Sequence, residues 1–415
     1  MKNESLSQHK VSRFQARYCY SQRTRPLPKL AQIRAPLYHS GIISKPISPR
    51  APGTSEQPYG YTVKRIVFRT LLLMGLTSAL SGCIGPSYYA ESLGGHLKIM
   101  GKRQSVAKLA RDPATPGALR ARMTSAGAIR QFAVDELALP DNASYRSYVD
   151  IGRDYVTLAV YAAPEFSLRP RIWCFPVFGC VPYRGYFSKD TALKTADRLH
   201  RQGFDVHISG VTAYSTLGWT SDPLLSTMFR SDEAHLASLV FHELAHQRVY
   251  VKGDTAFNEA FAVAVEVSGV RKWLRAAGDA AGLARYEAGR KRAADFLALV
   301  ARTRTELARI YAGPGSAETR RTAKSAAIER LRTRYRQMRD RRWGGYRGFD
   351  GWVESPINNA KLAATSVYND LVPAFMRLFE LCAGDYERFY DAVARLGRVN
   401  KAGRTEALEA ARSCR

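Results

Sequence analysis

Residues 231–265 read SDEAHLASLVFHELAHQRVYVKGDTAFNEAFAVAV and contain the strongest helical pattern in this chain of 415 residues. Ser231 can cap a helix, and the carboxylates of Asp232 and Glu233 suit the positive N-terminal end of a helix. The apolar side chains of the segment recur at helical spacing on one face: Leu236, Leu239, Val240 and Leu244. We therefore expect an amphipathic helix over residues 231–250.

The pentapeptide His-Glu-Leu-Ala-His lies inside this helix. At about 3.6 residues per turn, His242 and His246 project from one face, one turn apart, so both imidazoles can reach one metal ion. Glu243 points to the neighbouring side, where a metal-bound water can sit. This is the HExxH geometry of zinc peptidases, and it predicts a site for one Zn²⁺ ion.

A catalytic zinc ion needs a third protein ligand and an open position for water. The chain offers such a ligand soon afterwards, because Gly253 can end the first helix and Asp254 or Thr255 can cap a second one. The second helix would return along the first and bring Glu259 to the metal. Glu243 would then take a proton from the water and deliver it to the departing amine during peptide hydrolysis.

HExxH followed by Asn-Glu-Ala at residues 258–260 is the gluzincin arrangement, and the wider sequence resembles the proteobacterial lipoproteins called putative aminopeptidases. The resemblance extends from Cys83 to about Leu396. Four passages carry it besides the metal motif: LPDNASY at 139–145, YRGYF at 183–187, AYSTLGW at 213–219 and NNA at 358–360.

The resemblance implies a zinc-dependent aminopeptidase in which His242, His246 and Glu259 bind the metal and Glu243 is the general base. Peptides would be its substrates. The resemblance also implies a zincin-like catalytic domain. We therefore expect an α+β, mainly helical fold with a small mixed sheet and a helical hairpin insertion.

Glu266 is an alternative third ligand. Only 12 residues separate His246 from Glu259, whereas many gluzincins have a longer connection, and Glu266 lies at a spacing closer to theirs. Seven helical residues span roughly 10 Å, so both carboxylates cannot bind one ion from a straight helix. We favour Glu259 because Asn258 completes the Asn-Glu pair, and we assign Glu266 to orienting a ligand histidine. His235 is expected at the surface or behind the ligands.

The group that stabilises the oxyanion has two candidates. Tyr368 and Tyr214 each carry a hydroxyl that could stand opposite the metal, and each could equally be a core tyrosine. Residues 213–216 could form an edge strand that pairs with an extended peptide beside the metal, or a plain sheet edge.

The N-terminal part of the chain is expected to be absent from the mature protein. Residues 1–62 are rich in breakers and lack apolar periodicity, so we interpret them as disordered or as a spurious extension before a start at Val63. Residues 63–82 combine a basic start with a short apolar run and end in Leu-Ser-Gly before Cys83, which resembles the signal peptide and lipobox of a bacterial lipoprotein. Cys83 would carry the lipid. Ile84, where inner-membrane lipoproteins usually have Asp, implies the outer membrane, facing the periplasm.

The net charge of +27 is concentrated in two regions. Residues 1–82 hold 13 of the 63 Lys and Arg residues and 2 of the 36 acidic residues, so the expected catalytic domain at 83–415 carries +16. Residues 280–342 contribute +11 of this, and the breaker at 313–315 divides them into two basic helical arms, which predicts a hairpin.

Interspersed acidic residues make this hairpin typical of a solvated helical face. The alternative function is a non-catalytic outer-membrane lipoprotein that binds anionic envelope polymers or lipids through the hairpin. Nucleic acid is disfavoured as a partner by the expected secretion and by the lack of a groove-reading motif in the sequence.

Four cysteines remain after the leader and the lipobox are set aside, and an even number suits the oxidising periplasm. We expect Cys174 to pair with Cys180 around a local loop, and Cys382 to pair with Cys414 as a clasp on the C-terminal tail, although four cysteines allow three pairings. Before the metal motif, two helices are expected over residues 88–137.

Overall fold

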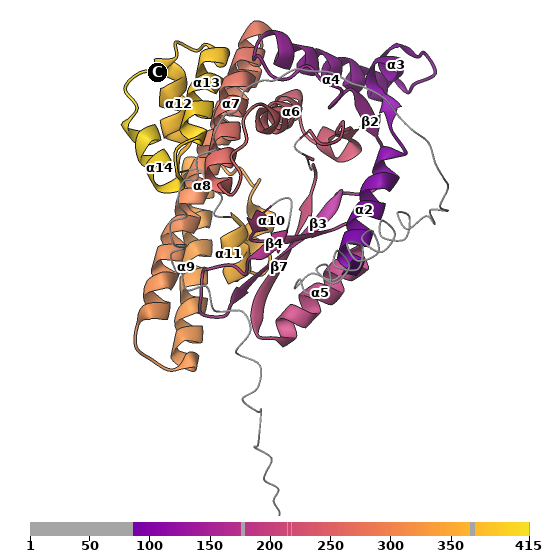
Figure 1. The fold of residues 1–415 in the computed structure, drawn as a ribbon. Coiled ribbons are helices and arrows are strands. Elements are labelled where there is room, and N and C mark those ends of the chain that lie inside the picture. Colours follow the sequence, from indigo (N-terminus) through magenta and orange to yellow (C-terminus); the bar gives the residue numbers. More distant parts are fainter. Residues whose placement is uncertain (1–85, 176–178, 214, 217, 366–369, 415) are drawn as a thin grey trace, which may run out of the picture. The chain divides into compact units, whose positions relative to one another are not determined.

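The computed structural model describes residues 86–175, 179–213, 215–216, 218–365 and 370–414, which form an α+β and mainly helical fold, as expected (Figure 1). The expected leader, Cys83, Tyr214 and Tyr368 lie outside the described residues. Among the residues that are described, no helix has the length and apolar character needed to cross a membrane.

Helices α6 (Glu233–Arg248) and α7 (Thr255–Ala276) pack side by side at the centre of the core (Figure 1). Asp232, rather than Ser231, caps α6, because its carboxylate accepts a hydrogen bond from the backbone N–H of His235. Asp254 caps α7 in the same way. The turn between the helices needs a positive φ of 81° at Gly253, which glycine adopts without strain.

One glycine sets how closely α7 approaches its neighbours. A Cβ added at Gly269 would lie 2.8 Å from a methyl carbon of Leu137 and 2.9 Å from the ring of Phe241 on α6. Since carbon atoms do not approach so closely without displacement, only glycine allows this packing. The close approach brings the polar side chains of the two helices within reach of each other.

Three helices precede the sheet, where two were expected over residues 88–137: α2 (Pro86–Met100), α3 (Val106–Arg111) and α4 (Gly117–Asp135). The additional break follows Gly101, where the chain turns before the two-residue strand β1 (Gln104–Ser105). Helix α4 packs against α6 and completes one wall of the core.

A three-stranded antiparallel sheet lies beside the helices, with the long strands β3 (Thr157–Pro164) and β7 (Phe204–Val211) paired along their full length. The short strand β6 (Arg184–Tyr186) pairs with the other edge of β3. Helix α5 (Lys189–Arg201) packs on one face of β3 through alternate residues, including Leu158 and Val160. Helix α11 (Asn359–Thr365) also contacts β3 and β7.

Two smaller sheets complete the strand structure. Strands β2 (Ser147–Val149) and β8 (Leu224–Leu225) join β1 in one of them. Strands β4 (Trp173–Phe175) and β5 (Gly179–Val181) form a hairpin closed by a disulfide between Cys174 and Cys180.

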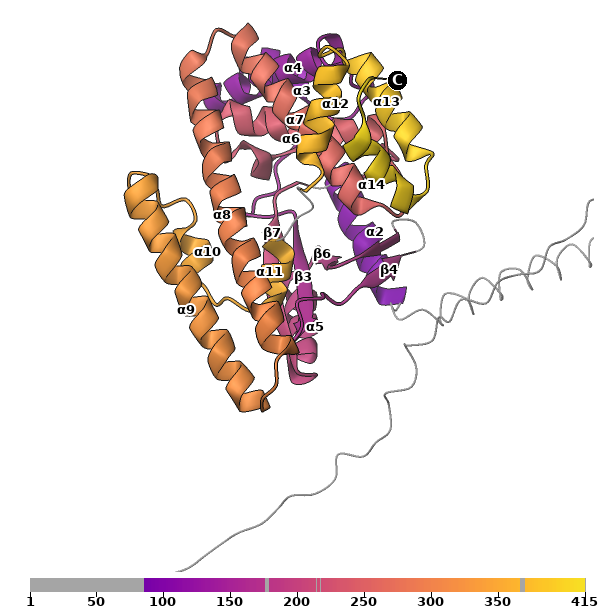
Figure 2. The ribbon, with the colours of Figure 1, turned by 90° about the vertical axis from the view of Figure 1, so that its left-hand side faces the viewer.

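Residues 280–342 form helix α8 (Ala280–Ala312) and helix α9 (Ala317–Arg342), which pack against each other (Figure 2). Much of the positive charge of this hairpin is paired with acidic groups. Lys324 contacts Asp205 on β7 at 2.6 Å, and the other main pairs join Arg321 to Glu165, Arg330 to Glu306, Arg339 to Asp350 and Arg342 to Asp295. The short helix α10 (Asp350–Glu354) covers part of its apolar core.

The chain ends in three helices beside α7 (Figures 1 and 2): α12 (Val372–Leu381), α13 (Tyr386–Gly397) and α14 (Lys401–Ala410). A disulfide between Cys382 and Cys414 closes this group. Arg404 on α14 is buried and contacts Asp254, the cap of α7. The C-terminal helices therefore support the start of the helix that carries Glu259.

Candidate metal centre

Three side chains from the two central helices converge on one point. Nε2 of His242 lies 3.2 Å from Nε2 of His246, and these two nitrogens lie 3.4 Å and 3.7 Å from the carboxylate oxygens of Glu259. Atoms bound at about 2.1 Å to a common tetrahedral centre stand about 3.4 Å apart. The three side chains therefore have the spacing expected of three ligands of one ion, and their candidate ligand atoms all lie within 4.8 Å of one another.

Glu266 lies behind the cluster and binds the other side of a histidine ring. Its Oε2 is 3.2 Å from Nδ1 of His242, so this carboxylate can hold the proton on Nδ1 and leave Nε2 free to coordinate. The second ring is held differently: Nδ1 of His246 is buried and has no hydrogen-bond partner among the described residues. The arrangement places Glu259 within the cluster and Glu266 behind it.

The three side chains of the cluster strongly affect one another's pKa values. Burial lowers the pKa of His242, but its hydrogen bonds to Glu259 and Glu266 outweigh this effect and raise that pKa to about 10. Burial and the neighbouring His242 lower the pKa of His246 to about 4. Burial would raise the pKa of Glu259, but the two histidines hold it below its usual value. The carboxylates thus favour a positive charge at the point where the rings meet.

Asn258 explains why the turn between the helices brings Glu259 to this point. Its side chain is buried and accepts a hydrogen bond from the N–H of Val251 while donating one to the carbonyl of the same residue, both at 2.8 Å. The amide thus replaces a backbone partner for the loop. The loop cannot shift without breaking both bonds, so the first turn of α7 is held against the end of α6.

Glu243 follows His242 of the cluster on α6 and is half-buried. Burial raises its pKa to about 7, and the nearby carboxylates of Glu259 and Asp222 act in the same direction, against His242. Asp222 is itself buried and accepts hydrogen bonds from the hydroxyl of Ser215 and from the backbone and hydroxyl of Thr216. A carboxylate with a pKa near neutrality can both accept and release a proton.

Tyr145 is a neighbour of Glu243 that the sequence argument did not single out. It is fully buried, and burial together with Glu243 and Asp222 raises its pKa well above the ordinary value. Its backbone has a φ of 62°, a conformation that is uncommon for a tyrosine and typical of constrained sites. The buried Arg130 of α4 holds the preceding segment by donating to three carbonyls: Pro140, Asn142 and Ser144. The passage LPDNASY drew attention to this segment of the sequence, but nothing in that passage indicated that Tyr145 lies beside Glu243.

Two partly exposed tyrosines lie around Glu259. Tyr183, in the turn between β5 and β6, is 39% exposed. Partial removal of the phenol from water raises its pKa to about 12, and the nearby Tyr161, Glu259 and Glu243 act in the same direction. The ring of Tyr161 lies 5.5 Å from that of Tyr183. Tyr250 is 43% exposed, and burial followed by the charge of Glu259 raises its pKa. Both phenols therefore lie close enough to Glu259 for its charge to affect their pKa values.

Two further sequence predictions concern His235 and residues 213–216. His235 is exposed on α6 and takes no part in the cluster. The described residues of segment 213–216 are not in a strand; instead Thr216 is tied to Asp222 through its backbone N–H at 2.9 Å. The plain sheet-edge alternative was therefore wrong for the described residues of this segment, whereas pairing with an extended peptide stays a prediction.

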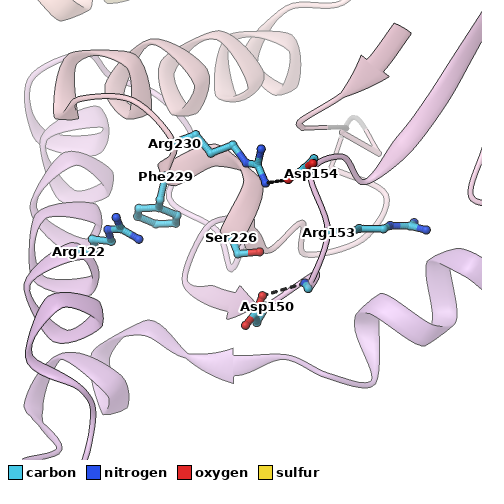
Figure 3. Close-up of a pocket in the computed structure, with 8 residues that line it drawn as sticks. Arg122, Asp150, Arg153, Asp154, Ser226, Phe229 and Arg230 are labelled. Atoms are coloured by element: carbon cyan, nitrogen blue, oxygen red, sulfur yellow. Dashed lines mark hydrogen bonds and ion pairs between the residues drawn. The ribbon is translucent and has the colours of Figure 1, made fainter. Parts of the chain in front are cut away.

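A separate surface pocket of about 560 Å³ opens near α4 and the 3-10 turn η1 (Ser226–Phe229) (Figure 3). Arginines and aspartates line it, and Arg230 pairs with Asp154 at 2.6 Å. No member of the His-Glu cluster contributes to its lining. This pocket is therefore separate from the His-Glu cluster.

Comparison with known proteins identifies a family for this chain. Residues 87–408 match the model of a family described as "Putative aminopeptidase". No curated protein and no solved structure matches the chain. The matched segment contains both central helices, the sheet and the C-terminal helices, and it supports a peptidase-like function. Because the match covers more than half of the 415 residues, the chain belongs to the putative aminopeptidase family.

Proposed function

We propose that this protein is a zinc-dependent aminopeptidase that hydrolyses peptides in the periplasm, anchored to the outer membrane through a lipid on Cys83. The single observation that carries the enzymatic proposal is the convergence of His242, His246 and Glu259, with Glu243 beside them. Family membership supports the aminopeptidase class. The anchor and the compartment rest on the lipobox sequence at residues 80–83.

The donor set fits zinc. Two imidazole nitrogens and one carboxylate oxygen are the ligands of catalytic zinc sites, whereas Ca²⁺ and Mg²⁺ prefer all-oxygen sites. His242, His246 and Glu259 would hold the ion, and Glu266 would keep the first of these rings oriented. When bound, zinc supplies Lewis acidity, which activates water near neutral pH and polarises a carbonyl group.

Glu243 would do the proton transfers. Its pKa of about 7 allows it to take a proton from the attacking water and to give it to the leaving amine at a periplasmic pH near neutrality. The carboxylates of Glu259 and Asp222 support this by disfavouring a third fixed negative charge. Glu243 thus serves as base and then as acid within one cycle.

Tyr183 joins Tyr214 and Tyr368 as a candidate for stabilising the oxyanion. Its exposure and its closeness to both Glu243 and Glu259 suit a hydroxyl that meets substrate, and its raised pKa keeps the phenol protonated as a donor. Tyr145 lies deeper, and we assign it to shaping the surroundings of Glu243.

The alternative function, in which the hairpin of α8 and α9 binds anionic envelope polymers or lipids, has less support. Many cations of α8 and α9 contact acidic groups of this same chain, so they help to hold the hairpin in place. No observation favours an anionic polymer as their partner over these intramolecular pairs.

The test combines metal content with release of free amino acids from short peptides. Glu243→Gln should retain zinc and lose at least 100-fold in turnover, and Glu233→Gln, an exposed position on the same helix, should change neither. His246→Ala should lose zinc, whereas His235→Ala should keep it. A chelator should abolish turnover reversibly. Zinc with unchanged turnover in Glu243→Gln would reject the catalytic assignment.

A further inference from the structure

Helix α2 presents a row of large apolar side chains to solvent. Tyr89, Leu93 and Leu97 are 40%, 60% and 58% exposed. They follow each other at intervals of four residues, so they lie within about 80° of one another around the helix axis. Single exposed apolar residues are common on protein surfaces, but a contiguous row on one helix is typical of a contact surface.

The opposite face of α2 is fixed to the body of the domain. A Cβ added at Gly95 would lie 2.3 Å from the ring of Phe187, so the helix approaches the end of β6 as closely as glycine allows. The ring of Tyr88 packs edge-on to Tyr186 at 5.6 Å. Glu91 accepts a hydrogen bond from the backbone N–H at the cap of α5 at 3.0 Å. The helix therefore cannot rotate to bury its apolar row against its own chain.

Basic residues stand at the C-terminal end of this row. Lys98, Lys102 and Arg103 are exposed, while Glu91, the acidic residue of α2, is turned toward α5. The outer side of α2 thus carries leucines and a tyrosine, and exposed cations follow at the C-terminal end of the helix. This combination suits an interfacial helix, in which apolar side chains enter the acyl region, aromatic rings sit among headgroups, and cations contact lipid phosphates.

The position of α2 in the chain indicates which lipid surface it would meet. The helix begins at Pro86, three residues after Cys83, and three residues span at most about 10 Å. We propose that the apolar face formed by Tyr89, Leu93 and Leu97 lies on the phospholipid bilayer as a second membrane contact. This proposal rests on the proposed anchor for its location but is independent of the peptidase activity. The contact would fix the orientation of the domain relative to the bilayer.

Photocrosslinking in the bacterial envelope tests the contact on the full chain. A benzophenone amino acid replaces Leu93 or, as the matched control, Leu193, which is 41% exposed on α5. The probe at 93 should give phospholipid adducts at least fivefold above the probe at 193. With the probe at 93, Tyr89→Gln together with Leu97→Gln should lower the adduct yield several-fold, and Leu193→Gln should leave it unchanged.

Three outcomes would overturn the proposal. They are equal lipid labelling at 93 and 193, no lipid adduct at 93, and adducts from 93 to protein only, which would assign the face to a second copy or to another segment of this chain. The mass of the N-terminal peptide reports acylation of Cys83 separately. Lipid labelling at 93 without acylation would retain the contact and remove the anchor, so the two failures are distinguishable.

Discussion

The Glu266 carboxylate lies 3.2 Å from Nδ1 of His242, and the other nitrogen of the same ring, Nε2, lies 3.4 Å from Glu259. The spacing of seven positions between the two glutamates places one on each side of the same imidazole. In the proposed zinc site a single helix, α7, would thus supply both a ligand and the group that orients another ligand. This division explains why two glutamates that cannot both bind one ion are both part of the site.

Replacing Glu266 should weaken zinc binding without abolishing it. Glu266→Ala removes the acceptor for Nδ1 of His242, and loss of such an orienting group typically raises the zinc dissociation constant about 10- to 100-fold. Glu266→Gln keeps an acceptor oxygen and should have a smaller effect, while Glu259→Ala should have a larger one. Competition with a calibrated chelator measures all three. Retention of zinc in Glu259→Ala with loss in Glu266→Ala would exchange the two roles.

Asn258→Ala should destabilise the protein by about 1–3 kcal/mol, because the N–H of Val251 loses its partner and the carbonyl of Val251 keeps only the hydrogen bond from the N–H of Asp254. Asn258→Asp keeps the acceptor but loses the donor, so it should fall between the wild type and the alanine variant. Urea unfolding of the metal-free proteins measures the difference. An unfolding free energy unchanged in Asn258→Ala would show that the loop does not depend on this side chain.

The helical half of the fold and the convergence of His242, His246 and Glu259 could be predicted because their signals are local. His242, Glu243 and His246 share one helix, so their relative positions follow from helical geometry alone. The short turn to Glu259 carries its own signals in Gly253 and the capping aspartate. A local pattern of this kind needs no knowledge of tertiary packing.

The surroundings of Glu243 could not be predicted, because they depend on contacts between distant segments. Tyr145 reaches the site through a loop held by Arg130 on α4, and Asp222 reaches it from the segment before β8. Thr216 was expected to offer its backbone to a strand, but Asp222 binds it instead. Sequence spacing contains no information on which buried carboxylate will meet which loop.

The pair of Arg404 and Asp254 should behave as a coupled buried ion pair. Arg404→Met removes the buried cation of Asp254 and leaves only the exposed Lys401, at 3.8 Å, beside the carboxylate; breaking a buried pair in this way typically costs about 3–5 kcal/mol. Asp254→Asn still offers a capping oxygen to α7 but leaves Arg404 uncompensated. The double variant should be more stable than the sum of the two single effects allows, by at least 1 kcal/mol. Additive losses in thermal or urea unfolding would show that the two side chains act separately.

His207 should make the stability of the fold sensitive to mild acid. It lies on β7 opposite Tyr161 and faces the buried Lys361 of α11; burial first, and then the charge of that lysine, lower its pKa to about 4. Since an unfolded histidine has a pKa of about 6.5, the unfolded chain binds the extra proton between pH 6.5 and 4. The free energy of unfolding should therefore fall as the pH falls through this window, by at most about 3 kcal/mol from this residue.

Comparison of variants isolates the contribution of His207 from that of the metal ligands, which also titrate. His207→Gln cannot gain a proton, so its unfolding free energy should fall less steeply than that of the wild type between pH 6.5 and 4, with the curves parallel above pH 7. His200→Gln, at an exposed position on α5, should follow the wild-type slope. Urea unfolding at a series of pH values, with chelator present throughout, gives the slopes. Equal slopes for His207→Gln and the wild type would mean that His207 is as readily protonated in the folded protein as in the unfolded chain.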